Sequence, residues 1–561
     1  MIKLLLFFLV AVFLNFSKCA LQGPPSGGLP DTSPPQVIDR SPVPELVGVD
    51  PSEVISCTFS ERVDIRTAES AFFVSPRPQK PIQFNWNGNQ VFLHWTERLD
   101  LETTYVITLR TSVKDLRNNP MESPIQWAFS TGKKLDRGTI AGKIIDSELS
   151  KENEIWAYRI TMPDTISPLT SYPQFRTNNE KDGFFNLSYL KKTKYRIFGV
   201  LDRNRNGLYD IGIDDIGIPS KDIQITEKGK APFIWLRLSK EDTTAPRLRR
   251  VIPQDNDHLS LVFSKAIDEL GLPSVNSFLV TTGIETLNIK DIACLSKSNN
   301  TIELFTDTLT PYTLYYIKIT GIKDRAGNLL NSRYDTASFR GITLKDTISP
   351  KIITFEPSPD STKKIPPYQS LFLEFSEIMN RTSVEKGFII SESGVDSIPL
   401  LFQWADGARV LIKPINGFHQ GKNYQIIIKS KEIQDVSSNC LTDSVFFHKL
   451  LVLDSIQTGS LSGKIESDSA EITSPLIVVL KNINQGKEIS RRVLSKPGLF
   501  TFSNVPPGSY ILECFEDKDG NGKYFYGSIK PYRPSENYMH YEKPIDIRAG
   551  WDTEEILLRF P

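Results

Sequence analysis

The sequence predicts an all-β protein, a tandem array of small β-sandwich domains that follows a cleaved targeting segment. Short runs of Val, Ile, Phe and Tyr alternate with turns rich in Pro, Gly, Asn and Asp, and no long amphipathic helical pattern competes with them. Two sequence units recur along the chain, one of them three times and the other twice. The 561 residues then divide into five units of about 100 residues, each large enough to have its own hydrophobic core.

The composition excludes nucleic-acid binding as the main function. Lys and Arg together number 66, as do Asp and Glu, so the net charge is zero and no basic face for nucleic acid is expected. Beyond Cys19 no repeat unit holds two cysteines, which excludes an intradomain disulfide framework. We expect the other four cysteines to be small buried hydrophobic residues: Cys57, Cys294, Cys440 and Cys514.

Residues 1–18 are typical of a signal peptide. A short cationic start precedes an apolar run, Leu4 to Leu14, that is too short to cross a bilayer comfortably. Residues 15–19, Asn-Phe-Ser-Lys-Cys, resemble the lipobox of bacterial lipoproteins. The resemblance implies that Cys19 is acylated and holds the protein on a membrane, because several acyl chains at one residue give durable anchoring. The alternative is a secreted soluble protein in which Cys19 is incidental.

Residues 19–39 are rich in Pro and Gly and lack apolar periodicity. We expect them to form an extended tether that lifts the first domain away from the membrane. The tether is expected to have no fold of its own.

The triplicated unit has four landmarks in a fixed order. Each copy opens with Asp-Thr, has Pro four residues after the Asp, and reaches a strand that ends in Phe-Ser-Glu or Phe-Ser-Lys. A second strand places one Tyr and two aliphatic residues on one face, which we expect to pack into the core. The Asp that follows is expected to accept hydrogen bonds from the backbone amides of a tight turn. The Tyr strands are Tyr105–Leu109, Tyr315–Ile319 and Tyr424–Ile428, and the turns begin at Asp115, Asp324 and Asp435.

These landmarks resemble the SbsA-type bacterial Ig-like domain, a seven-stranded sandwich found in tandem on surface and envelope proteins. Glu61 and Glu377 are interpreted as solvated strand ends rather than catalytic acids, because Lys265 takes the same place in the second copy. The implied Ig-like domains are residues 40–132, 242–345 and 346–455.

Proline stands at the start of every copy and predicts the shape of the array. Pro35, Pro246 and Pro350 hold their own φ angle and restrict the residue before them. We therefore expect stiff, extended junctions and a rod-shaped molecule.

The duplicated unit covers residues 136–240 and 458–561. Its copies open with the same Gly-x-x-x-Gly-Lys-Ile pattern and continue through alternating apolar residues to a tyrosine strand at Tyr195 or Tyr510. These features resemble the CnaB-like, carboxypeptidase regulatory-like or prealbumin-like sandwich. The resemblance implies two domains of that fold.

Each tyrosine strand of the duplicated unit runs into a loop rich in oxygen-bearing side chains. Both loops follow the pattern Asp-x-(Asn/Asp)-x-Asn-Gly, the first half of an EF-hand-type calcium loop in which the sixth-position Gly makes a sharp turn. The carbonyls of Leu208 and Lys523 could complete the ligand sets. The expected calcium ligands are Asp202, Asn204, Asn206 and Asp210 in the first loop and Asp517, Asp519 and Asn521 in the second.

The glutamate of the twelfth calcium-loop position is missing, since Ile213 and Ser528 stand there. Asp210, Asp214 or Asp215 could close the first site. The alternative is a hairpin stabilised by Asx turns, which needs the same residue types and no metal. If calcium binds, so few charges predict weak affinity, roughly 10⁻⁴ to 10⁻³ M.

No motif of catalysis stands out in the sequence. There is no Gly-x-Ser-x-Gly elbow, Walker loop or His-Glu-x-x-His motif, and the five histidines are dispersed, so no zinc or haem site is evident. The seven tryptophans are expected to pack in cores rather than to form a sugar-binding platform, because most of them sit in strand-like runs.

We therefore predict a non-enzymatic lipoprotein of the bacterial cell envelope, held in the outer membrane and facing the periplasm or the surface. Its function would be that of an elongated Ig-like stalk or scaffold for adhesion or for presenting a binding surface. Its partners would be the membrane, through the lipid, and an envelope or extracellular protein or polysaccharide. The alternative is a carbohydrate- or peptide-binding accessory protein of an envelope enzyme or transporter, which exposed aromatic side chains lining one groove would favour.

Overall fold

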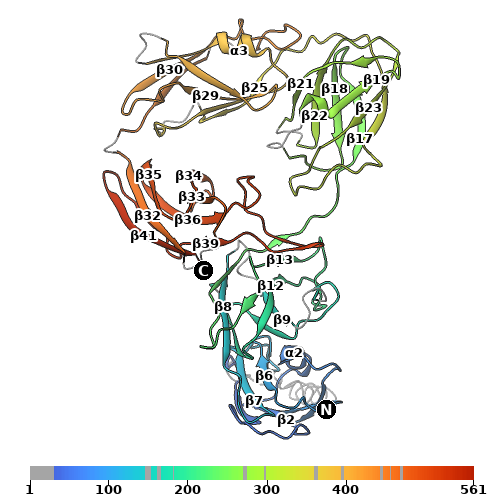
Figure 1. Ribbon diagram of the computed structural model, residues 1–561, viewed down its shortest axis with the longest axis vertical. Coiled ribbons are helices and arrows are strands. Elements are labelled where there is room, and N and C mark those ends of the chain that lie inside the picture. Colours follow the sequence, from blue (N-terminus) through green and yellow to red (C-terminus); the bar gives the residue numbers. More distant parts are fainter. Residues whose placement is uncertain are drawn as a thin grey trace, which may run out of the picture.

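The computed structural model confirms the all-β tandem array (Figure 1). Five β-sandwiches follow one another and are called domains 1 to 5: residues 31–132, 136–240, 242–345, 346–454 and 457–560. Residues 1–18 and Cys19 lie outside the described part of the chain, as does most of the expected tether. The structure describes residues 31–145, 153–160, 166–180, 182–268, 274–295, 299–358, 364–392, 397–442, 446–454, 457–467 and 472–560.

Domain 1 packs a four-stranded sheet against a three-stranded sheet, the seven strands expected of the fold. Helix α2 (Ile65–Ala71) joins the sheets, and its N-cap Asp64 accepts hydrogen bonds from the amides of Arg66 and Thr67. Strand β1 begins at Val37, inside the segment expected to be tether, because Val37 pairs with Phe59. In strand order the sheets are β1 (Val37–Ser41), β2 (Ile55–Phe59), β5 (Gln90–His94), β4 (Gln83–Asn87), and β3 (Phe72–Ser75), β6 (Thr104–Leu109), β7 (Ile125–Ser130).

Domains 3 and 4 repeat this plan. Domain 3 has an additional strand and the 3-10 helix η2 (Val275–Ser277), whereas domain 4 has helix α3 (Arg381–Gly387), capped by Asn380. The sheets of domain 3 are β17 (Leu248–Pro253), β18 (His258–Phe263), β22 (Thr301–Thr306), β21 (Ile289–Ala293), and β20 (Thr286–Leu287), β19 (Phe278–Thr281), β23 (Leu314–Ile319), β24 (Thr336–Arg340). Those of domain 4 are β25 (Ile352–Glu356), β26 (Leu371–Phe375), β29 (Arg409–Pro414), β28 (Leu400–Trp404), and β27 (Phe388–Glu392), β30 (Asn423–Ile428), β31 (Phe446–Leu451).

The tyrosine strands β6, β23 and β30 lie in the cores as expected. Their alternate residues are buried in the three separate hydrophobic cores. Each tyrosine hydroxyl also accepts a hydrogen bond from the backbone amide five residues upstream, at 2.8 to 2.9 Å. The tyrosine, which is the second residue of each strand, therefore fixes the loop that leads into the strand. The tyrosines are Tyr105, Tyr315 and Tyr424.

Domains 2 and 5 share a second plan, in which the first strand pairs in parallel with the last strand of its sheet. The second Gly of the shared pattern, Gly142 or Gly463, is needed because a Cβ there would collide with the ring of Phe185 or Phe500. The sheets of domain 2 are β10 (Phe175–Asn178), β9 (Glu154–Arg159), β12 (Lys194–Leu201), β13 (Asp215–Gly217), β16 (Ser239–Lys240), with β14 (Ile223–Gln224) beside β12, and β11 (Phe184–Leu190), β8 (Gly138–Ile144), β15 (Ile234–Leu236). Those of domain 5 are β35 (Leu499–Val505), β32 (Gly459–Ser467), β41 (Asp552–Phe560), and β34 (Glu488–Leu494), β33 (Leu476–Asn482), β36 (Gly508–Glu516), β39 (Tyr538–His540), with β40 (Ile545–Ile547) beside β36, and the hairpin β37 (Ser528–Ile529), β38 (Tyr532–Arg533).

The expected rod is wrong for domains 2 to 5, because the chain turns back and domain 5 packs against domain 2 (Figure 1). Domains 3 and 4 contact each other through Arg381 and Asp291, whose side chains lie 2.9 Å apart. Domain 5 contacts domain 4 through Lys487 and Glu356. The four domains form a closed ring from which domain 1 projects. Proline restricts only the backbone next to it, so stiff seams do not by themselves make the array straight.

Candidate functional site

The contact between domains 2 and 5 centres on Arg237, which lies just after β15. Its guanidinium carbon lies 5.0 to 5.3 Å from the ring centroids of three tyrosines of domain 5: Tyr524, Tyr526 and Tyr538. The guanidinium also lies 4.0 Å from Glu513. Cation–π contacts of this kind strengthen when the cation is desolvated, as it is between two domains.

The β37–β38 hairpin of domain 5 covers the outer face of the β9–β12 sheet of domain 2. Ile529 packs in a cluster with Trp156 and Phe198, and its amide donates a hydrogen bond to Glu241 at 3.1 Å. Tyr532 lies beneath the guanidinium of Arg196 at 4.1 Å. Strand β12 is thus buried on both faces, one by the core of domain 2 and the other by domain 5 and domain 2 loops.

The first oxygen-rich loop has the hydrogen bonds of an Asx-turn hairpin. The amides of Asn206, Gly207 and Leu208 donate to the side chains of Asn204, Asp202 and Asn206. Asp210 accepts from the side-chain amides of both asparagines at 2.7 Å. Gly207 has a φ of +75°, as the turn requires.

The same loop also has one feature that suits a cation. The Oδ1 atom of Asp202 is buried and has no hydrogen-bond partner among the described residues, and burial raises the pKa of this carboxyl group. Asp214, which the sequence left as one of three candidates to close the site, instead accepts hydrogen bonds from the amides of Arg203 and Asp210. Calcium at this loop stays a prediction, and the Asx turns exist without it.

The second oxygen-rich loop brings together more negative charge. Carboxylate oxygens of Asp517, Asp519 and Glu536 lie within 4.8 Å of one another. Glu536 is almost fully buried, and burial together with Asp519 and Asp517 raises the pKa of its carboxyl group. Asn521 bonds within the loop and is exposed. The donor set is of hard oxygen atoms, which fits calcium.

Glu536 was missed from the sequence because it lies outside the loop pattern. The calcium-loop pattern places its closing glutamate at the twelfth position, where this loop has Ser528 instead. Glu536 reaches the loop from the segment before β39 and accepts hydrogen bonds from the amides of Lys518 and Phe525 at 2.7 and 2.9 Å. If calcium binds, Asp517, Asp519 and Glu536 would hold it.

The turn aspartates of the Ig-like domains are self-bonded as expected. Asp115 accepts from the amides of Arg117 and Asn119, and Asp324 and Asp435 have equivalent partners.

The end of the Phe-Ser-Glu strand in domain 4 differs from the expectation. Glu377 is not a solvated end, because it is half-buried beside Asp346 and Asp435, with carboxylate oxygens within 4.8 Å. Burial and these two carboxylates raise its pKa to about 7.

The remaining expectations about single residue types are mostly correct. Trp127 and Trp156 are buried in cores and four further tryptophans are partly buried, whereas Trp551 is 65% exposed. Three cysteines are buried as expected, but Cys440 is exposed, because it stands at the rim of the Asp435 turn.

His258 lies close to two aspartates, with ligand atoms of His258, Asp255 and Asp346 within 4.8 Å of one another. The group spans domains 3 and 4, and the spacing of the histidines in the sequence did not suggest it.

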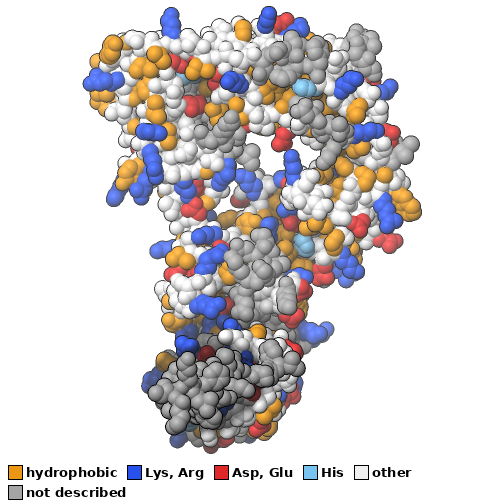
Figure 2. Space-filling model, turned by 180° about the vertical axis from the view of Figure 1, so that it is seen from behind, with side chains coloured by type: hydrophobic (Ala, Val, Ile, Leu, Met, Phe, Trp, Pro, Cys, Tyr) orange, Lys and Arg blue, Asp and Glu red, His pale blue; other side chains and the backbone are white. Residues whose placement is uncertain are grey.

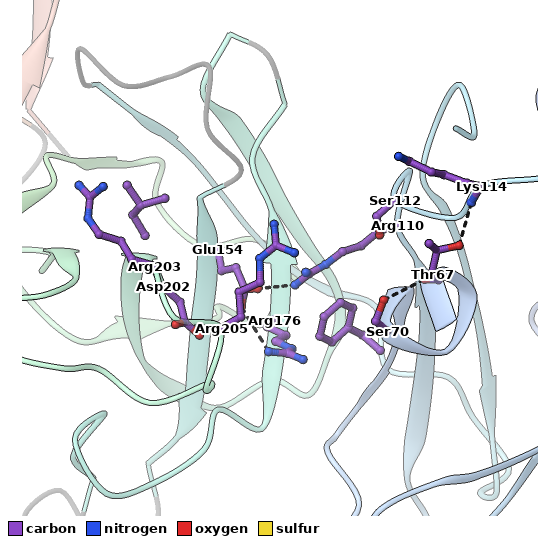
Figure 3. Close-up of a pocket in the computed structure, with 12 residues that line it drawn as sticks. Thr67, Ser70, Arg110, Ser112, Lys114, Glu154, Arg176, Asp202, Arg203 and Arg205 are labelled. Atoms are coloured by element: carbon purple, nitrogen blue, oxygen red, sulfur yellow. Dashed lines mark hydrogen bonds and ion pairs between the residues drawn. The ribbon is translucent and has the colours of Figure 1, made fainter. Parts of the chain in front are cut away.

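A cleft between domains 1 and 2 is lined mainly by basic and hydroxyl side chains (Figure 3). Its volume is about 850 Å³. At its inner end, Arg110 of domain 1 and Arg176 of domain 2 both contact the carboxylate of Glu154, and both guanidiniums stack on Phe73. On the face that Figure 2 shows, basic and acidic side chains are interspersed, in keeping with the zero net charge.

The fold and its repeated turns define a tandem Ig-like protein. The bacterial Ig-like domain family matches residues 31–131, 242–341 and 346–448, together more than half of the chain. The chain therefore belongs to the bacterial Ig-like domain family, which indicates an extracellular or envelope-associated protein. The matched segments are domains 1, 3 and 4, the three copies of the triplicated unit.

Comparison with solved structures finds only distant likeness. An L,D-transpeptidase from Mycobacterium smegmatis is 17% identical, with 20% of this chain and 46% of that chain covered and a TM-score of 0.14. The N-terminal part of the bacterial S-layer protein SbsC is 17% identical, with 38% and 45% covered and a TM-score of 0.16. The major pilin subunit BcpA of Bacillus cereus is 10% identical, with 76% and 99% covered and a TM-score of 0.14.

The chain spans less than half the length of the first two of these structures, and TM-scores this low support no conclusion about function. A search of curated proteins found no match. Among the described residues, no helix has both the length and the apolar character needed to cross a membrane.

Proposed function

We propose that this protein is a non-enzymatic scaffold lipoprotein of the bacterial cell envelope. Acylated Cys19 is its outer-membrane anchor, domain 1 is a spacer, and domains 2 to 5 are a rigid frame that presents a binding surface to an envelope or extracellular protein or polysaccharide. The observation that supports this proposal best is the contact of domain 5 with domain 2 around Arg237. A ring of sandwiches holds its surfaces in fixed relative positions, as a scaffold requires.

The frame differs from an elongated stalk in what it can present. In a rod each domain contacts only the domains next to it in the chain, whereas ring closure also brings domain 5 against domain 2. Lys523 of domain 5 lies 3.5 Å from Asp268 of domain 3, and Gln420 of domain 4 bonds Asn504 of domain 5 at 3.0 Å. Weak polar contacts of this kind add rigidity by number rather than by individual strength.

Acyl labelling of the full chain in a bacterial host tests the anchor. We expect the label to be lost in Cys19→Ala and retained in the matched control Cys440→Ala, which removes the exposed cysteine of domain 4. Absence of label from the unaltered chain would remove the lipoprotein from the proposal and favour a secreted scaffold. The frame is tested separately, by the effect of Arg237→Ala on small-angle X-ray scattering of the full chain.

A second candidate function is that of a binding accessory protein for an envelope enzyme or transporter. The cleft between domains 1 and 2 favours this candidate, since it is a concave site with convergent polar groups. Aromatic stacking on sugar rings is not supported there, because Phe73, the only aromatic side chain among the described residues that line the cleft, is already covered by two guanidiniums.

A further inference from the structure

The cleft between domains 1 and 2 is preformed, because contacts on several sides fix the two domains. The amide of Arg77 in domain 1 donates to the carbonyl of Gln174 in domain 2 at 2.9 Å, and its guanidinium stacks on Tyr172 at 3.9 Å. On another side, Arg137 pairs with Glu45 at 3.0 Å. A ligand that enters the cleft therefore meets side chains already in place, which lowers the entropy lost on binding.

The inner end of the cleft has an excess of positive charge. Glu154 is the shared partner of Arg110 and Arg176, so one carboxylate faces two guanidiniums. Burial raises the pKa of Glu154, but Arg176 and Arg110 outweigh it and hold that pKa below its ordinary value. The pKa of Arg176 falls to about 10, because of burial and the neighbouring Arg110 and Arg77. Such crowding is relieved when an anion binds.

One buried donor at this end has no acceptor. The Nε atom of Arg110 is buried and makes no hydrogen bond to any described residue. Buried polar groups are nearly always satisfied in folded proteins, by protein, by water or by ligand. The inner end of the cleft therefore has a donor for which no described residue supplies an acceptor.

The outer part of the cleft adds further cations on both walls. Lys114 from domain 1 and Arg205 from domain 2 make no ion pair with any residue in the described part of the chain. Ser70 and Ser112 of domain 1 supply hydroxyl groups on the same side of the cleft as Lys114 (Figure 3). The remaining acid, Asp202, accepts a hydrogen bond from the amide of Gly207 at its Oδ2 atom, and its buried Oδ1 atom has no partner among the described residues.

We propose that this cleft binds a ligand with two or more oxyanion groups, either phosphoryl groups or carboxylates spaced along a saccharide. One oxyanion takes the inner position at Arg110, and a second is held by Lys114 and Arg205. Guanidinium groups suit this role because their planar donors match the oxygens of carboxylates and phosphates. This inference does not depend on the lipid anchor or on the closed ring of domains 2 to 5.

Isothermal titration calorimetry of the full chain tests the proposal with three probes: inorganic pyrophosphate, trigalacturonate and the neutral maltotriose. We expect at least one anionic probe to bind and the neutral trisaccharide not to bind. Binding of pyrophosphate alone assigns phosphoryl groups, and binding of trigalacturonate alone assigns carboxylates. The double variant Lys114→Gln/Arg205→Gln should weaken anion binding at least about tenfold, since each charge-assisted hydrogen bond removed is a strong one.

The matched control is Lys228→Gln/Lys318→Gln, which removes two exposed lysines of domains 2 and 3 that are remote from the cleft residues in sequence and do not line it. It should bind the anions as the unaltered chain does. Thermal unfolding confirms that both double variants are folded. The proposal is overturned if neither anion binds at millimolar concentration, if maltotriose binds equally well, or if both double variants lose affinity to the same extent.

Discussion

The ammonium nitrogen of Lys265 lies 2.7 Å from the buried carboxylate of Asp324 in domain 3, and it also contacts Asp242. Domains 1 and 4 have a glutamate at this position, so each gathers three carboxylates where domain 3 has two and a cation. In domain 4 these are Asp346, Glu377 and Asp435. Domain 3 thus shows that a lysine at this position neutralises the repulsion between carboxylates that domains 1 and 4 retain.

Glu377→Lys should therefore stabilise domain 4. The new ammonium would take the place that Lys265 has in domain 3 and would replace repulsion by ion pairs, a gain of about 1 kcal/mol. Hydrogen–deuterium exchange of the β30 amides in the full chain, at a pH above 7, should slow about fivefold. The reverse variant Lys265→Glu should speed exchange of the β23 amides. Faster exchange in β30 of Glu377→Lys would contradict this account.

Glu377 also predicts a pH dependence for domain 4. Its pKa is about 7 in the folded chain against an ordinary value of 4.5, so between these values the folded state keeps a proton that the unfolded state releases. The contribution of this group to stability is therefore complete below about pH 4.5, falls as the pH rises to about 7, and then levels off.

Urea unfolding of the full chain, followed by β30 amide exchange at several pH values, measures this slope. Glu377→Gln should flatten the decline, because glutamine has no proton to lose. Glu385→Gln, which removes an exposed carboxylate of domain 4 outside the group of Asp346, Glu377 and Asp435, is the matched control. Equal slopes in Glu377→Gln and the unaltered chain would show that another group is responsible.

The sandwich fold could be predicted from the sequence because its signals are local and repeated. The alternation in β6, β23 and β30 and the Asp turns that follow them depend on neighbouring residues alone, and three copies made chance agreement implausible. The type of the Ig-like domain and the prealbumin-like kinship of domains 2 and 5 stay predictions. The hydrogen bond that each of these tyrosine hydroxyls accepts was not anticipated, although the tyrosine is the second residue of all three strands.

Contacts between distant domains were not predicted, yet the strands involved have a visible signal. Strand β12 reads Lys-Tyr-Arg-Ile-Phe-Gly-Val-Leu, and β33 has five consecutive aliphatic residues from Leu476 to Leu480. Consecutive apolar residues indicate a strand buried on both faces, whereas a solvated sandwich face alternates. The pattern could have shown that both faces of each sheet are buried. It could not have shown that the second faces of the sheets in domains 2 and 5 are buried against each other.

Arg237→Ala should loosen the contact between domains 2 and 5. The guanidinium lies among three tyrosine rings, and a desolvated cation–π contact is worth about 2 kcal/mol. Small-angle X-ray scattering should then give a larger radius of gyration and maximum dimension than for the unaltered chain. Arg247→Ala is the control, because Arg247 stacks on Tyr334 within domain 3 and its loss leaves the ring closed. A scattering profile unchanged in Arg237→Ala and in the stronger Arg237→Glu would contradict the importance of this contact.

Calcium at the second oxygen-rich loop gives the last prediction. Asp517, Asp519 and Glu536 repel one another without a cation, so calcium should stabilise domain 5. For a dissociation constant of about 1 mM, 10 mM calcium would add about 1.4 kcal/mol of unfolding free energy. Differential scanning calorimetry of the full chain should show the transition of domain 5 rising with calcium, and magnesium should act less because it demands a stricter geometry.

The variants separate a calcium site from an Asx-turn hairpin. Asp519→Asn keeps a side-chain oxygen for the amide of Asn521 but removes a charge, so it should lose the calcium response without losing the turn. Asp202→Asn, in the first loop, is the matched control and should leave the response of domain 5 intact. A calcium-independent transition in the unaltered chain and in both variants would show that the loop is a self-bonded hairpin, stabilised by the hydrogen bonds to Asp517 and Glu536 alone. Tyr524 follows this loop and Tyr538 follows Glu536, and both rings contact Arg237. A calcium response would therefore link metal binding to the contact between domains 2 and 5.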